Sequence, residues 1–150
     1  MGFTRHKMQQ KLPVIKVVGV SASGKSTLVR ALREHGYDAR AVSQEHSHSA
    51  TLWKQFDVTR VLIYLDSTLE VQQQRRPDVT WNAGNLAAER QLLHNARAEA
   101  DLRLNTAQLS SADVLHLALA YLRAKRIRHA PGPLPPAGET GAPVKGKIRL

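Results

Sequence analysis

Cysteine is absent from this 150-residue sequence, which excludes disulfides, thiolate metal sites and a cysteine nucleophile. Long apolar runs are absent too: no stretch of about 18 apolar residues occurs, so the sequence predicts no membrane span. Residues 1–11 are basic and polar and contain no apolar core, unlike a secretory signal. These three absences lead us to expect a cytoplasmic protein.

Acidic residues are scarce relative to basic ones, 12 against 22, and the formal net charge is +10. Such an excess is typical of proteins that bind nucleic acid. However, residues 12–122 contain nearly equal numbers of acidic and basic side chains, and the excess lies in residues 1–11 and 123–150. These basic segments either keep the protein soluble or make weak contact with nucleic acid or another acidic surface.

The chain length fits one domain, which we place at residues 12–128. It is preceded by the basic segment 1–11 and followed by residues 129–150, whose proline and glycine content predicts a disordered tail. Within the domain, short β-branched segments alternate with amphipathic ones. This alternation predicts a parallel sheet with helices on both faces. We therefore expect a three-layer α/β/α fold with about four strands in the order 2-1-3-4.

The expected strands are residues 14–20, 38–43, 61–66 and 101–105, and the expected helices are 26–35, 67–75, 85–100 and 111–125. Ser67-Thr68-Leu69-Glu70 has the pattern of a capping box that opens the second helix, and Pro77 follows its end. Between strands two and three, residues 44–57 predict a loop with one short helix at 49–56.

The first predicted strand leads into the segment Gly19-Val20-Ser21-Ala22-Ser23-Gly24-Lys25-Ser26, which matches the pattern G-x-x-x-x-G-K-[ST] at every fixed position. In this pattern, the P-loop of nucleotide-binding proteins, backbone N–H groups surround a phosphate at a helix N-terminus. Lys25 would supply a full positive charge to the outer phosphates, and the Ser26 hydroxyl would ligate Mg²⁺. The predicted nucleotide-binding residues are Gly19, Ser21, Ala22, Ser23, Gly24, Lys25, Ser26 and Thr27.

Two acidic residues are candidates for the chemistry beside the phosphates. Asp66 ends the apolar run of the third strand, where it either ligates Mg²⁺ as a Walker B acid or helps to start the next helix. Glu45 follows the second strand, at the edge where ligands of parallel α/β sheets bind. There Glu45 either orients the metal or accepts a proton from an acceptor hydroxyl, or it is a solvated loop residue.

Other side chains have two interpretations each. Arg75 and Arg76 precede Pro77 and either contact bound phosphates or end a solvent-exposed helix. Arg90 is a further candidate for anion binding. Two histidines, His46 and His48, lie in the loop of residues 44–57. One of them could contact a substrate, whereas a zinc site would need a third ligand. Trp53 and Trp81 either stack on a ligand ring or belong to the core.

With these residues, the chain resembles the small P-loop kinases of the shikimate kinase, gluconate kinase and nucleoside monophosphate kinase group over about residues 12–124. The resemblance is carried by the P-loop, by Tyr64-Leu65-Asp66-Ser67 before a helix that ends in Arg75-Arg76-Pro77, by Glu89-Arg90 in a long helix, and by Leu109-Ser110-Ser111-Ala112-Asp113-Val114 at the last helix. The chain departs from the group in a short connection after strand two, a reduced lid at about 76–85 and Ser43-Gln44-Glu45 in place of Asp-x-Asp.

The resemblance implies a P-loop NTPase fold that binds ATP, or GTP, with Mg²⁺. It places Lys25 and Ser26 at the nucleotide and metal, Arg75 or Arg76 at the base of the lid, and Glu45 on the side of the acceptor. The leading hypothesis is therefore phosphoryl transfer from ATP to a small-molecule acceptor, with Lys25, Glu45, Asp66 and Arg76 as catalytic residues. The alternatives are a nucleotide-binding module or slow NTPase without an acceptor, and a nucleic-acid-associated protein that uses its basic tails.

Overall fold

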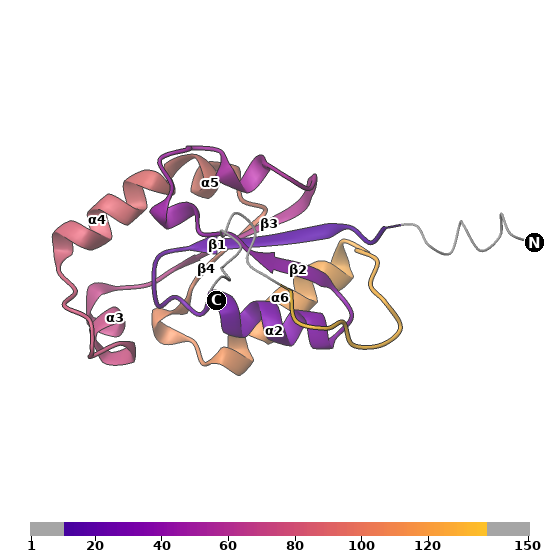
Figure 1. The fold of residues 1–150 in the computed structure, drawn as a ribbon. Helices are drawn as coiled ribbons and strands as arrows, with labels where there is room; N and C mark the ends of the chain where they lie inside the picture. The colour runs from indigo at the N-terminus through magenta and orange to yellow at the C-terminus, as the bar shows by residue number, and fades with distance from the viewer. Residues whose placement is uncertain (1–10, 138–150) are drawn as a thin grey trace, which may run out of the picture.

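A computed structural model describes residues 11–137 of the chain and contains one parallel sheet with helices on both of its faces (Figure 1). The strands are β1 (Val14–Gly19), β2 (Asp38–Ala41), β3 (Thr59–Asp66) and β4 (Leu102–Asn105). The helices are α2 (Lys25–Glu34), α3 (Leu69–Arg75), α4 (Ala83–Leu92), α5 (His94–Glu99) and α6 (Ser111–Ala124). Short 3-10 helices η1 (Gln44–His46), η2 (Leu52–Lys54) and η3 (Thr106–Gln108) complete the element order.

The sheet has four strands in the order β2-β1-β3-β4, and every neighbouring pair is parallel. The predicted strand number and order are therefore confirmed. Because parallel neighbours require crossover connections, a helix or a longer segment lies between successive strands. The strands point the same way, so the segments that follow β1, β2 and β3 emerge at one edge of the sheet.

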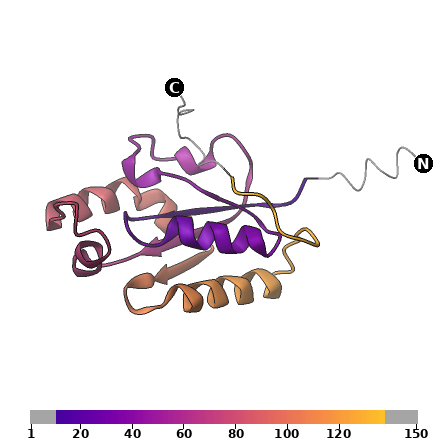
Figure 2. The ribbon, with the colours of Figure 1, turned by 60° about the horizontal axis from the view of Figure 1, so that its bottom comes forward.

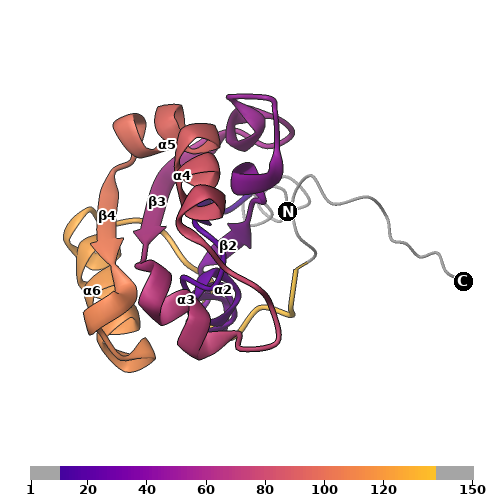
Figure 3. The ribbon, with the colours of Figure 1, turned by 90° about the vertical axis from the view of Figure 1, so that its left-hand side faces the viewer.

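Alternation along the strands divides the core into two layers. On β1 and β3, Ile15, Val17, Val61, Ile63 and Leu65 pack against α2 and α6. The residues between them, including Val18, Leu62 and Tyr64, pack against α4 and α5 on the opposite face. Figure 3, which shows the sheet nearly end-on, has α4 and α5 over one face and α2 and α6 over the other. Strand residues face alternate sides, so one hydrophobic strand supplies both layers.

Two predicted helical details differ in the structure. The expected helix 85–100 is divided into α4 and α5 at Leu93, which is fully buried and has φ −95° and ψ 0°. Leu93 and Ala96 both lie in the core layer behind β3. The cap of α3 is Thr68, not Ser67: the Thr68 hydroxyl accepts a hydrogen bond from the N–H of Val71.

Residues 44–57 fold around a buried lysine of β1. Lys16 is 0% exposed, and its ammonium group donates hydrogen bonds to the carbonyl oxygens of Trp53, Gln55 and Asp57 at 2.8, 2.8 and 2.7 Å. Burial lowers the pKa of Lys16, and nearby Asp57 opposes that shift. One cation thus gathers three carbonyls of a segment with little regular structure, in which the sequence predicted one helix and the structure has η1 and η2.

The segment after α6 turns back along α2. Ile127 is buried in the core layer shared by α2 and α6, the N–H of Ala130 donates to the carbonyl of Gly36, and the N–H of Leu134 donates to that of Arg33. In Figure 2 this yellow segment passes beside α2. The sequence predicted a disordered tail from residue 129. As far as residue 137, the chain instead follows a defined course without regular secondary structure.

Across residues 11–137, no helix has both the length and the apolar character that crossing a membrane requires.

We predict that Lys16→Met lowers the free energy of unfolding by roughly 2–4 kcal/mol, because it leaves three carbonyl groups without their shared donor. Urea unfolding measures the change. Lys11→Met is the control: the Lys11 side chain is exposed and only 4.0 Å from a carboxylate of Asp57, and its loss should change stability by about 0.5 kcal/mol or less. Equal effects of the two substitutions would show that the ammonium does not hold the segment.

Candidate functional site

The candidate site is built on the loop that joins β1 to α2, residues 19–26. Ala22 and Gly24 have positive φ angles of 60° and 97°, and successive turns of this kind make the backbone concave. Gly19 lies so close to β3 that a Cβ atom there would stand 2.3 Å from the carbonyl oxygen of Leu65. The loop thus needs glycine at its start for space and at Gly24 for its backbone angles.

The carbonyl groups of the loop are held from outside by side chains of other elements. Gln72 of α3 donates to the carbonyl of Ser21 at 2.9 Å, and Arg75 donates to that of Ala22 at 2.7 Å. Thr106 of η3 donates to the carbonyl of Ser23 at 2.7 Å. These donors fix the orientation of consecutive peptide groups, because the N–H of a peptide points away from its carbonyl; of the N–H groups concerned, that of Ser23 donates to the carbonyl of Val20 at 3.3 Å.

Several N–H groups of the loop remain available. Among residues 11–137, the N–H groups of Ala22, Gly24, Lys25, Ser26 and Thr27 donate to no acceptor. The last three belong to the first turn of α2, whose N–H groups have no partner within the helix and carry its positive dipole end. The arrangement is an array of backbone donors suited to an anion.

Lys25 folds back over this array and meets a buried carboxylate. Its ammonium donates to the carbonyl oxygens of Gly19 and Val20 at 2.9 and 3.1 Å. It also lies 2.9 Å from Oε2 of Glu45 in η1, whose side chain is only 5% exposed. The structure therefore brings together Lys25 and Glu45, two residues that the sequence placed at the site separately.

A second carboxylate, Glu89 of α4, binds the start of the loop. It accepts hydrogen bonds from the N–H of Ser21 at 2.9 Å and from the Ser21 hydroxyl at 2.6 Å. Glu89 is 8% exposed. His46 stands beside the same hydroxyl, with Nε2 3.5 Å from Ser21 Oγ and 3.6 Å from Glu45 Oε2. The two buried acids thus contact the loop at neighbouring points.

Asp66 ends β3, as the sequence predicted, and its contacts run toward α4. Its Oδ1 accepts hydrogen bonds from the N–H of Ser67 and from the guanidinium of Arg90. Arg90 also donates to the carbonyl of Ser67 at 2.8 Å. Arg90 is thus engaged at the end of β3.

The two adjacent arginines of α3 differ in their surroundings. Arg75 crosses to the loop and to η3, where it donates to the carbonyl of Thr106 at 2.9 Å. Arg76 points to solvent with a side chain 55% exposed and pairs with Asp78 at 2.8 Å. Hydrogen bonding to Asp78 raises the pKa of Arg76. Arg75 therefore contacts the loop, whereas Arg76 pairs with Asp78, two residues along the chain.

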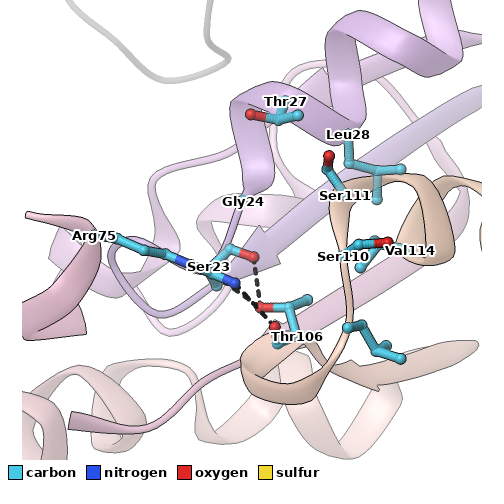
Figure 4. Close-up of a pocket in the computed structure, with 10 residues that line it drawn as sticks. Ser23, Gly24, Thr27, Leu28, Arg75, Thr106, Ser110, Ser111 and Val114 are labelled. Atoms are coloured by element: carbon cyan, nitrogen blue, oxygen red, sulfur yellow. Dashed lines mark hydrogen bonds between the residues drawn. The ribbon is translucent and has the colours of Figure 1, made fainter. Parts of the chain in front are cut away.

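A cavity of about 340 Å³ opens between the loop, the start of α2 and the start of α6. Figure 4 shows Ser23, Gly24 and Thr27 on one side, and Ser110, Ser111 and Val114 on the other, with Arg75 and Thr106 joined across the base. Its volume lies in the range of small-ligand sites, and so does the mixture of apolar walls with a few polar groups.

A second cavity, of about 470 Å³, lies beside η1 and α4. Glu45, His46 and Glu89 line it together with Trp81 and Leu92. Because Glu45 contacts Lys25 and Glu89 contacts Ser21, both acids connect this cavity to the loop. Trp53, the other tryptophan, is buried in the core layer next to α4.

Within the described part of the chain, no group of three or more His, Asp or Glu side chains is arranged to hold a metal ion. His46 and His48 accordingly have no third metal ligand beside them among residues 11–137. The Ser26 hydroxyl is exposed at the start of α2. It is available as one oxygen ligand to a metal that arrives with phosphate oxygens.

Sequence reasoning missed Gln72 and Thr106, which orient the loop, and gave Glu89 no role of its own. Glu89 was visible only as part of a helix. Apolar periodicity identifies buried apolar faces but does not show which polar residue on a helix will lie against a distant loop. Comparison with protein-family models and with curated protein sequences finds no match for this chain.

We predict a coupling energy of about 1–3 kcal/mol between Lys25 and Glu45, because both charges are largely withdrawn from water. The measurement is a double-mutant cycle of Lys25→Met and Glu45→Gln in urea unfolding. Lys54 and Glu99 form a matched control pair, 3.5 Å apart with side chains about half exposed, for which we expect about 0.5 kcal/mol or less. Equal coupling in the two pairs would contradict the predicted effect of burial.

Proposed function

We propose that this chain binds a nucleoside triphosphate with Mg²⁺ at residues 19–26, as a P-loop protein does, and transfers the γ-phosphoryl group to a small acceptor. The observation that carries the proposal is the array of inward N–H groups at the start of α2. In the loop before α2, the carbonyls of Ser21, Ala22 and Ser23 accept hydrogen bonds from Gln72, Arg75 and Thr106. A triphosphate has the oxygen-rich, highly charged form that such an array can bind.

Two cavities of the structure support the proposal. The cavity beside α6 would hold the base and ribose, because it begins at Ser23, Gly24 and Thr27, next to the N–H groups that would hold the phosphates. The cavity lined by Glu45 and Glu89 would then lie at the other end of the triphosphate. A donor and an acceptor could thus meet in line across the loop.

In this scheme Lys25 changes its partners when the nucleotide binds. The β- and γ-phosphates replace the Glu45 carboxylate as the negative partner of the Lys25 ammonium. Glu45 then becomes free to accept a hydrogen bond from the acceptor. The Ser26 hydroxyl is a metal ligand of the scheme, with Asp66 or Glu45 as the carboxylate near it; Mg²⁺ would neutralise phosphate charge. Catalysis rests on positioning and charge stabilisation.

We predict that Lys25→Ala reduces ATP turnover at least about a hundredfold while the circular dichroism spectrum stays unchanged, because it removes the only full charge on the donor array. The release of ADP measures turnover. Lys54→Ala, at an exposed position distant in sequence from the loop, is the control and should retain the wild-type rate. Normal turnover by Lys25→Ala would refute the scheme, and so would calorimetry that detects no binding of ATP or GTP to the wild-type chain at millimolar ligand.

A second prediction concerns the outer side of the loop. Thr106→Val keeps the shape of the side chain but removes the donor to the carbonyl of Ser23, so we expect ATP to bind about three- to tenfold more weakly. Thr106→Ser keeps the hydroxyl and should bind ATP nearly as the wild type does. Calorimetry with both variants makes the comparison. If the valine and serine variants bind equally well, the orientation of the loop does not depend on this hydrogen bond.

A further inference from the structure

We propose that the acceptor is a hydroxyl compound without negative charge, favoured when it also carries an amino group, and that it binds in the cavity lined by Glu45 and Glu89. This inference rests on the proposed function and names its substrate class.

The charge of the cavity is the first argument. Its charged lining residues are Glu45 and Glu89, which are 4% and 8% exposed, and it has no lysine or arginine among its lining residues. The nearest cation is Lys25, and the proposed scheme assigns that ammonium to the triphosphate. An acceptor with a carboxylate or phosphate group would therefore meet two buried like charges with no cation of its own, at a substantial cost in free energy.

The neighbouring arginines do not change this balance. Arg90 lies on α4 one residue after Glu89, but its guanidinium is engaged by Asp66 and the carbonyl of Ser67. Arg76 is paired with Asp78 in solvent. In the structure, the guanidinium groups of Arg76 and Arg90 are thus paired with groups outside the cavity lining, and the basic side chain within the lining, His46, lies 3.6 Å from Oε2 of Glu45.

An unused acceptor atom is the second, independent argument. Among residues 11–137, Oε1 of Glu45 is buried and has no hydrogen-bond partner, whereas Oε2 is held by Lys25. An unpaired buried carboxylate oxygen is costly. Because an ionised carboxylate only accepts hydrogen bonds, the group that would satisfy it is a donor. A hydroxyl or an ammonium group provides one.

The remaining walls indicate the shape of the ligand. Val79, Trp81 and Leu92 add apolar surface to the lining of the cavity. The indole N–H of Trp81 donates to the carbonyl of Arg76 at 3.0 Å, which restrains the ring. A sugar ring or another compact ring has apolar faces that pack against such a side chain, while its hydroxyl or amino groups reach the carboxylates.

The geometry gives each acid a part in the reaction. The acceptor oxygen forms a bond to the γ-phosphorus, the bond from that phosphorus to the bridging oxygen breaks, and the nucleoside diphosphate leaves with the bonding electrons. The hydroxyl proton passes to Glu45, whose free oxygen faces no competing donor. Glu89, anchored on Ser21 by two hydrogen bonds, holds a second hydroxyl or the amino group.

The test measures ADP release at saturating ATP and Mg²⁺ with acceptors supplied in matched trios. Glucosamine, glucose and gluconate form one trio, and further trios use other carbon skeletons that bear an amino group, no charge, or a carboxylate or phosphate. We expect at least about tenfold stimulation above the basal rate by an amino or uncharged member, and none by its anionic counterpart. Preferential stimulation by anionic members overturns the inference, and so does the absence of stimulation by every member.

Two variants test the assignment of the cavity. Glu89→Gln should raise the acceptor KM about tenfold more for the amino compound than for the uncharged one, because it removes the charge but keeps an amide oxygen for Ser21. Glu99→Gln, at an exposed carboxylate, should change neither value. Trp81→Ala should raise the KM of both acceptors without changing the Kd of ATP. Equal KM values in the wild type and both cavity variants would show that the acceptor binds elsewhere.

Calorimetry with ATP alone separates the two levels of failure. If the chain binds ATP but ADP release shows no preference between uncharged and anionic acceptors, only the choice of substrate class is wrong. If the chain binds no nucleotide, the proposed function is wrong, and the inference that rests on it is wrong too.

Discussion

The structure of the candidate site depends on the outward fixation of the carbonyl groups between β1 and α2. A free loop of this composition has many conformations, because glycine and serine restrict the backbone weakly. Here three donors from two other elements, Gln72, Arg75 and Thr106, each bind a successive carbonyl. The preorganisation of the N–H groups is thus supplied by tertiary contacts, and an anion that binds there does not have to order the loop itself.

The arrangement of charge around the loop follows from the same constraint. Lys25 and Ser21 are occupied by Glu45 and Glu89, two carboxylates that stand where anionic oxygens fit. Buried charges need partners, and in the structure the acids and the loop satisfy one another. Under the proposed function, phosphate oxygens replace Glu45 beside Lys25, Glu89 stays on Ser21, and both acids offer their remaining acceptor capacity to the second substrate.

Lys16 connects this site to the rest of the fold. Its side chain leaves β1 on the face opposite α2 and gathers the carbonyls of Trp53, Gln55 and Asp57. That segment follows η1, and Gln44 of η1 accepts the N–H of Trp53 at 3.0 Å. The position of Glu45 is therefore set by a network of buried polar contacts. A short connection after β2 can hold a buried acid in place when such contacts replace regular structure.

Local sequence determined the strands, their order and the site loop. β-Branched runs, helix periodicity and the glycine spacing are properties of neighbouring residues, and the parallel connection rules leave few ways to arrange them. Asp66 at the end of β3 follows from the same local signals. Contacts between distant residues followed only from the tertiary structure. They include the break at Leu93, the role of Lys16, the course of residues 129–137 and the meeting of Glu89 with Ser21. The contacts of Lys16 and Glu89 depend on which polar atoms burial leaves without water. That is settled by the packing of whole elements, because a polar side chain looks the same in sequence whether it faces solvent or a distant loop.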